Sequence, residues 1–221
     1  MRGSLCKGIF AFVTQEEDAS QGIVNLTDPR AMRALAHPTR LRLVGLLRLE
    51  GPLTATQAAA LLGESSGSCS FHLRQLAKYG LVEETGGGQG REKPWRATAQ
   101  FTSWPNVPAS SEAAVATQQL ATVIAERYVE LLLTWLKTSQ SEPVAWQEAA
   151  QFGDSIVYLT AQELTELGAS VRDLVDRFAD RTADRSLRPA GSRAVSYLHL
   201  AFPTDHDQGP EVKELGDRPV G

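Results

Sequence analysis

The sequence predicts a mostly helical α+β protein made of two unequal parts. One observation is a succession of helix signals, tight turn and glycine-tipped hairpin between residues 54 and 98. The other is a wide apolar band along residues 110–137, which predicts one long helix. A proline-punctuated linker at 104–108 separates them. We therefore expect a first unit at 28–104, a second unit at 105–202, a partly disordered extension at 1–27 and a disordered tail at 203–221.

Composition places the chain among soluble globular proteins. Of its 221 residues 42% are apolar and 22% are charged, and no apolar run approaches the roughly 20 residues that span a bilayer. We therefore expect no membrane partner. The two cysteines, Cys6 and Cys69, lie far apart and do not form a disulfide framework, which suits a reducing cytoplasm.

Helix start and stop signals define the segment 54–80. Thr54 followed by Gln57 has the spacing of a capping box, so a helix is expected to begin here. Gly63 ends this helix, because glycine adopts the left-handed conformation at little cost. Ser65 or Ser66 then caps a second helix, which is expected to run to a stop at Gly80.

The second of these helices has two different faces. Cys69, Leu73 and Leu76 recur at spacings of four and three, which predicts a buried face. The remaining positions offer hydroxyl, amide, imidazole, aromatic and cationic groups, which suit phosphates and base edges. These candidate DNA-binding residues are Ser65, Ser66, Ser68, Ser70, Phe71, His72, Arg74, Gln75 and Lys78.

A hairpin is expected directly after this helix. Residues 81–84 and 95–98 read as two strands, and the loop 86–93 between them is rich in glycine. Arg91 and Lys93 in this loop, with Arg96 beyond it, are candidates for contact with DNA phosphates or the minor groove. Helix, turn, helix and cationic hairpin together predict a winged helix-turn-helix.

The distribution of charge agrees with a nucleic-acid partner although the net charge is −4. Residues 28–98 hold ten Lys/Arg and six Asp/Glu, a local charge of +4, so the remainder carries −8. Local positive charge, more than the total, sets the attraction to phosphates.

Three motifs resemble those of the ArsR-type winged-helix repressors. They are the run from His37 to Arg42 (HPTRLR), the run from Ser70 to Leu76 (SFHLRQL), and Gly80-Leu81-Val82. The similarity covers about residues 28–98. It implies a homodimeric transcriptional regulator whose second helix enters the major groove. The paired cysteines that metal-sensing members carry near this helix are absent, so metal sensing by that route is not expected.

The first unit is expected to open with further helices. Residues 23–26 suggest a short strand, and Asp28 with Pro29 caps a helix that ends near Ala36. Pro38 opens another helix that runs to Gly51. Arg40 and Arg42 lie off its apolar stripe, and either solvated surface or phosphate contact would explain them.

The second unit is predicted to be a long dimerisation helix followed by a small α+β cap. The band on 110–137 is too wide to leave in water, so it pairs either with a second copy or with the cap of its own chain. The cap is expected to contain a short helix at 146–152, strands at 156–159 and 194–202, and a helix opened by the capping box Thr160–Glu163.

The sequence offers no catalytic, metal or cofactor motif. It lacks G-x-S-x-G, Walker, H-E-x-x-H and G-x-G-x-x-G signatures in the required context. Cys69 and His72 form a C-x-x-H pair, but a core cysteine beside a surface histidine explains them more simply.

We therefore expect no enzyme but a sequence-specific regulator of double-stranded DNA, a repressor that reads a palindromic operator as a homodimer. A small-molecule effector could bind between the two units, where Trp146, Tyr158 or Tyr197 would line a pocket. The alternative function is a winged module used for protein contact, or for dimerisation in an enzyme such as a small-molecule methyltransferase.

Overall fold

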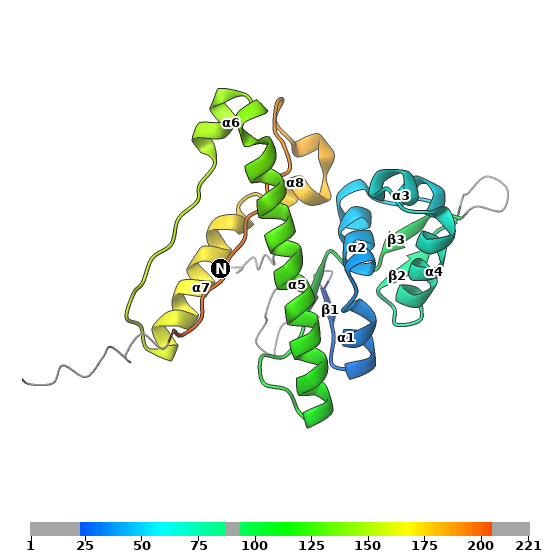
Figure 1. The fold of residues 1–221 in the computed structure, drawn as a ribbon, viewed down its shortest axis with the longest axis horizontal. Helices are drawn as coiled ribbons and strands as arrows, with labels where there is room; N and C mark the ends of the chain where they lie inside the picture. The colour runs from blue at the N-terminus through cyan, green and yellow to red at the C-terminus, as the bar shows by residue number, and fades with distance from the viewer. Residues whose placement is uncertain (1–22, 87–92, 205–221) are drawn as a thin grey trace, which may run out of the picture.

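A computed structural model describes residues 23–86 and 93–204 (Figure 1). Its first part contains β1 (Ile23–Asn25), α1 (Pro29–Leu35), α2 (Pro38–Glu50), α3 (Ala55–Leu62), α4 (Ser66–Ala77), β2 (Val82–Glu84), β3 (Trp95–Ala97) and β4 (Phe101–Ser103). The second contains α5 (Ser111–Thr138), η2 (Ser139–Ser141), α6 (Val144–Ala149), α7 (Ala161–Asp176), α8 (Asp180–Ala183) and η3 (Arg185–Leu187). The mostly helical α+β class is confirmed.

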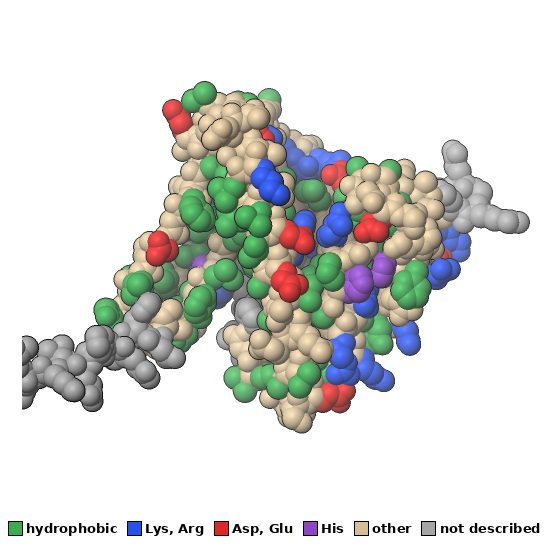
Figure 2. All heavy atoms as spheres, viewed as in Figure 1, with side chains coloured by type: hydrophobic (Ala, Val, Ile, Leu, Met, Phe, Trp, Pro, Cys, Tyr) green, Lys and Arg blue, Asp and Glu red, His purple; other side chains and the backbone are tan. Residues whose placement is uncertain are grey.

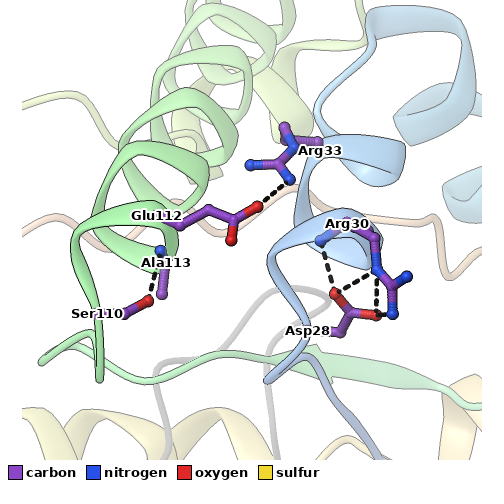
Figure 3. Close-up of polar contacts among 6 residues, drawn as sticks. All are labelled: Asp28, Arg30, Arg33, Ser110, Glu112 and Ala113. Carbon is purple, nitrogen blue, oxygen red and sulfur yellow. Dashed lines mark hydrogen bonds and ion pairs between the residues drawn. The ribbon is translucent and has the colours of Figure 1, made fainter.

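The predicted helix starts are confirmed at the level of single hydrogen bonds. The Asp28 carboxylate accepts from the Arg30 backbone N–H at 2.8 Å, with Pro29 in the first turn (Figure 3). Thr54 and Gln57 form the expected capping box, and Gly63 ends α3 in the left-handed conformation at φ 68°. The cap of α4 is Ser65, whose hydroxyl accepts from the Ser68 N–H at 3.1 Å. α4 ends at Ala77, three residues before Gly80.

Two small sheets flank these helices. β2 and β3 pair in antiparallel register, with Glu83 opposite Arg96, and form the hairpin that the sequence predicts. β1 confirms the short strand near residue 23 and pairs in parallel with β4. The sequence analysis missed β4, because three residues without clear alternation, Phe101 to Ser103, are too short for a pattern.

One hydrophobic core holds the first part together. It draws residues from α1, α2, α3, α4, β2, β3 and α5, and Leu35, Leu43 and Leu73 are among its members with no exposed surface. Arg48 is also buried, and it donates to the Ala99 carbonyl at 3.0 Å and the Thr102 hydroxyl at 2.7 Å. Burial lowers the pKa of Arg48 to about 10. These two bonds fix α2 to the segment that leads into β4.

The first half of α5 belongs to this core. Its buried residues, Ala113, Ala116, Leu120 and Ile124, recur at helical spacing and face α1. An ion pair of 2.6 Å between Arg33 and Glu112 joins the two helices near the Ser110 cap (Figure 3). The helix predicted at 110–137 is therefore confirmed, although the division between units at residue 104 stays a prediction. No helix among the described residues is long and apolar enough to cross a membrane.

The expected α+β cap is where the sequence prediction is wrong. Residues 156–159 and 194–202 are extended but form no strand, since no partner strand lies beside either segment in the described chain. The short helix lies at 144–149 instead of 146–152, and Phe152 is 82% exposed. The capping box at Thr160 and the helix that follows it, α7, are confirmed.

Candidate nucleic-acid interface

The core anchors α4 by one face and leaves the other outside. Cys69, Leu73 and Leu76 have no exposed surface, which confirms the predicted buried face. Phe71 is 52% exposed, and Ser66, Arg74 and Lys78 are exposed as well. Ser68, Ser70, His72 and Gln75 are half-buried along the flanks of the same helix. The structure thus brings the candidate residues of α4 onto one outward surface.

The first turn of α4 has a structural and a surface role at once. Because the Ser65 hydroxyl accepts from the Ser68 N–H, Ser65 fixes the direction in which the helix begins. Ser65 and Ser66 are both exposed. The turn therefore presents hydroxyls and free backbone N–H groups beside each other, as anion contact requires.

His72 is positioned by a residue that the sequence analysis missed. Its ring lies 4.6 Å from the ring of His37, centroid to centroid, and 5.2 Å from the edge-on ring of Phe71. Figure 2 shows imidazoles on this surface next to hydrophobic and basic side chains. His37 Nδ1 accepts from the Thr39 N–H at 3.2 Å and so caps α2. The signal was present, since a histidine directly before a helix-opening proline occupies a cap position.

The surroundings of both imidazoles disfavour the protonated form. Burial lowers the pKa of His37 and of His72, the nearby Arg40 guanidinium lowers both further, and Glu64 opposes the change. A neutral ring is also what the cap of α2 needs, because an accepting Nδ1 carries no proton. His72 Nδ1 is buried and has no hydrogen-bond partner among the described residues.

Arg40 and Arg42, for which the sequence allowed either solvated surface or phosphate contact, have different surroundings. Arg42 donates to the Leu62 carbonyl at 2.7 Å and lies 3.7 Å from Glu64. It therefore ties α2 to the turn between α3 and α4. Arg40 is half-buried, and its Nε has no hydrogen-bond partner within the described chain. Of these two arginines, only Arg40 remains a candidate for contact with a DNA phosphate.

In the wing, residues 82–97, both cations that the structure describes form ion pairs with glutamates. Lys93 lies 3.2 Å from Glu84, and Arg96 lies 2.6 Å from Glu83. Arg91 falls in residues 87–92, outside the described residues. Exposed pairs of this kind contribute at most about 1 kcal/mol, so a phosphate can replace the carboxylate partner at small cost.

The other sequence candidates do not form a site. Cys69 faces the core, and burial raises the pKa of its thiol. Within residues 23–86 and 93–204, no three His, Cys, Asp or Glu side chains group as metal ligands. The residues named for an effector pocket do not line an enclosed cavity here: Tyr158 and Tyr197 are 96% and 62% exposed, and Arg193 covers the Trp146 ring. A shallow hollow of about 450 Å³ lies instead between α1 and α5, lined by Arg33, Ala36, Gln118, Gln119, Thr122 and Val123.

Comparison with known proteins agrees with this geometry. A family model of a helix-turn-helix domain matches residues 35–85. This span runs from the end of α1 to β2 and so includes α2, α3 and the whole of α4. No curated protein sequence matches the chain.

Solved structures with partial similarity include three bacterial regulators. One is the homodimeric winged helix-turn-helix DNA-binding domain of Mb0332 from Mycobacterium bovis, a possible ArsR-family regulator (25% identity, 44% of this chain and 76% of that chain, TM-score 0.30). The others are the repressor BigR from Xylella fastidiosa (22%, 43% and 82%, 0.27) and apo MarR from E. coli (14%, 67% and 88%, 0.28). The family match over residues 35–85 carries the assignment: the chain contains a helix-turn-helix domain, which supports a DNA-binding transcriptional regulator.

Proposed function

We propose that the protein is a dimeric transcriptional repressor of the ArsR type, without enzymatic activity, that reads an imperfect palindrome in duplex DNA. The observation that carries this proposal is the division of α4. Three fully buried apolar side chains fix the helix, while polar, aromatic and cationic side chains cover its outer surface. A helix held in this way can enter the major groove without losing its packing.

On this surface, some side chains would contact base edges and others would contact phosphates. Gln75, Ser68 and Ser70 carry groups that can bond base edges, with glutamine preferring adenine. Phe71 is exposed enough to contact a thymine methyl group. Arg74, Lys78 and the wing residues Arg91 and Lys93 would neutralise phosphates, which sets affinity and register more than sequence preference.

His72 would support these DNA-contacting residues more than contact DNA itself. Its ring contacts the tilted ring of His37 and lies edge-on to the ring of Phe71, so it supports Phe71 and couples the start of α2 to the outer surface of α4. Arg40 lies next to this pair and lowers the pKa of both histidines. A phosphate near Arg40 would therefore meet this guanidinium beside the two imidazole rings.

The dimer would form through the second half of α5. Leu131, Leu132 and Trp135 are only half-buried in one protomer, and Val129, Leu133 and Leu136 are 48–54% exposed. To read two successive major grooves, this two-fold pairing must place the two copies of α4 about 34–36 Å apart, one turn of DNA. The operator half-sites should then be separated by the same distance.

A mobility-shift titration on the gene's own upstream region tests the proposal. Gln75→Ala should weaken binding to the preferred site by about 1–3 kcal/mol and change binding to random DNA little. The matched control is Gln140→Ala, the same change on η2, away from the helix-turn-helix. Equal losses on both DNAs would remove Gln75 from base reading, and a wild type without any salt-dependent, sequence-preferring shift would refute the regulator.

A further inference from the structure

The apolar side chains of the chain are distributed very unevenly. Among the described residues, every buried one lies at or before Ile124. Of the 24 exposed large hydrophobic residues, nineteen lie after that position. An exposed apolar surface of this extent marks an interaction site, because soluble monomers rarely leave such surfaces in water.

α7 shows this exposed apolar surface most clearly. Its capping box fixes where it begins, but none of its residues is buried. Leu164, Leu167, Val171 and Leu174 recur at helical spacing and form one apolar stripe, and Leu167 and Leu174 are 43% and 52% exposed. An isolated helix of 16 residues is only marginally stable in water. This stripe therefore needs an apolar partner.

The segments on either side of α7 also lack partners. Residues 151–159 and 193–204 are extended and make no backbone hydrogen bond within the described chain. Both are apolar, and Tyr158 and Phe202 are 96% and 68% exposed. Unpaired backbone groups in apolar, extended segments are stabilised when another chain pairs with them.

These parts make up a C-terminal arm, residues 150–204, that stands away from α5. Two ion pairs hold its far end, Arg185 with Glu50 at 3.1 Å and Arg193 with Glu142 at 2.6 Å. Figure 1 shows α7 beyond a gap from the lower half of α5. In the space-filling view this gap is a notch that opens downward, with hydrophobic side chains on its borders (Figure 2).

We propose that a second copy of this chain fills the notch, so that each arm clasps the α5 helix of the other protomer. The proposal rests on the proposed dimer and extends it from one helix pair to an exchanged arm. Val129, Leu133 and Leu136, exposed apolar residues of α5, lie in its second half, which continues upward from the notch in Figure 1. A partner that pairs with them can therefore extend along the notch to α7. By two-fold symmetry each copy then supplies both the clasp and the helix that is clasped.

The exposed surface is sufficient for such an interface. Phe152, Tyr158, Phe178, Tyr197 and Phe202 are 56–96% exposed. With about 150–250 Å² per aromatic side chain, these five expose on the order of 700 Å². A stable interface of standard size buries about 800 Å² per partner. The exposed area of the aliphatic residues of the arm and of α5 is larger than the remaining difference to about 800 Å².

The first test compares two glutamate substitutions on opposite faces of α7 in the full chain. Leu174→Glu places a charge in the apolar stripe and should raise the dimer dissociation constant at least tenfold, measured by light scattering over a dilution series. Thr165→Glu adds the same charge on the polar face and should leave the constant unchanged. If Leu174→Glu has no effect on the dimer, the clasp is refuted.

The second test identifies what covers the arm. Hydrogen exchange of residues 156–159 and 194–200 should be slow in the wild-type dimer and fast in the α5 variant Leu133→Glu/Leu136→Glu, made to be monomeric. Equal protection in both would mean that the arm is covered by its own chain, and deletion of residues 1–20 would show whether that segment does so. Rapid exchange in both would mean that no copy covers it. Either result overturns the proposal.

The two proposals fail separately. If the arm substitutions leave the dimer intact while the wild type still shifts DNA specifically, the clasp is wrong and the regulator stands. If the wild type dimerises through its arms but shifts no DNA, the clasp stands and the regulator is wrong.

Discussion

The two regions of the chain, residues 23–124 and residues 125–204, differ in whether their apolar side chains are buried within the same chain. The first region buries its hydrophobic residues in one core made by its own chain. The second contains α7, which has a complete capping box, and the shorter helices α6 and α8 without side-chain caps, and none of its described side chains is buried. The difference teaches that the first region specifies a fold by itself, whereas the second specifies elements whose packing needs another surface.

The largest effect should come from deleting a core side chain. Leu73→Ala removes a fully buried leucine from α4, and we expect a loss of about 2–5 kcal/mol in the free energy of unfolding, measured by urea denaturation. Leu174→Ala makes the same change in the second region, where the residue is 52% exposed. At concentrations where the chain is monomeric it should cost no more than about 0.5 kcal/mol. Equal losses would show that the second region has a core of its own.

A smaller effect should come from protonating the stacked histidines. Because the folded state lowers the pKa of His37 and His72 below the usual 6.5, the unfolded chain binds protons first as the pH falls. Stability should be complete above about pH 6.5 and should decrease as the pH falls through that value toward the lowered pKa values. Carboxyl groups with lowered pKa, such as Asp28 and Glu163, act only at more acidic pH.

The variants for this prediction again compare the two regions. His37→Asn keeps a side-chain oxygen that can cap α2 but removes one titrating ring, so the slope of stability against pH should become flatter. His199→Asn is the control, since His199 is exposed in the second region. Urea denaturation at stepwise pH measures both. An unchanged slope in His37→Asn would show that the stacked pair does not govern this part of the pH profile.

The smallest effect should come from the wing. Lys93→Ala removes a cation that must leave Glu84 to reach a phosphate, and the slope of log affinity against log salt should fall by about 0.9. Lys137→Ala removes the same charge near the end of α5 and should leave the slope as it is. A titration of DNA binding against salt would decide, and equal slopes for Lys93→Ala and the wild type would take Lys93 out of the interface.

Much of the first region could be predicted because its signals are local. Asp28, Thr54 and Ser110 each cap a helix by bonding a backbone N–H two or three residues away, and such bonds depend on near neighbours alone. The same reasoning located the cap of α7, in the region where the rest of the prediction failed. Local patterns therefore predicted the capped helices of both regions, whereas α6 was misplaced and α8 was missed, since neither has a side-chain cap.

The failures concern contacts between distant residues. Residues 156–159 are a short apolar run and residues 194–202 alternate, and both patterns are typical of strands. A strand exists, however, only where a partner supplies hydrogen bonds. β4 was missed for the converse reason, since its pairing with β1 depends on residues 78 positions apart and not on its own three residues. The contact of His72 with His37 arose in the same way.

The sequence by itself determined where the capped helices begin, which face of α4 is buried, and which side chains its other face offers. Only the tertiary structure decided that His72 stacks on His37, that Arg42 is used to hold a turn, and that Lys93 is paired with Glu84. The physical reason is range: a cap or an apolar stripe is formed by residues a few positions apart, whereas a stack, an ion pair or a strand pair requires the chain to return to itself, or to meet a second copy.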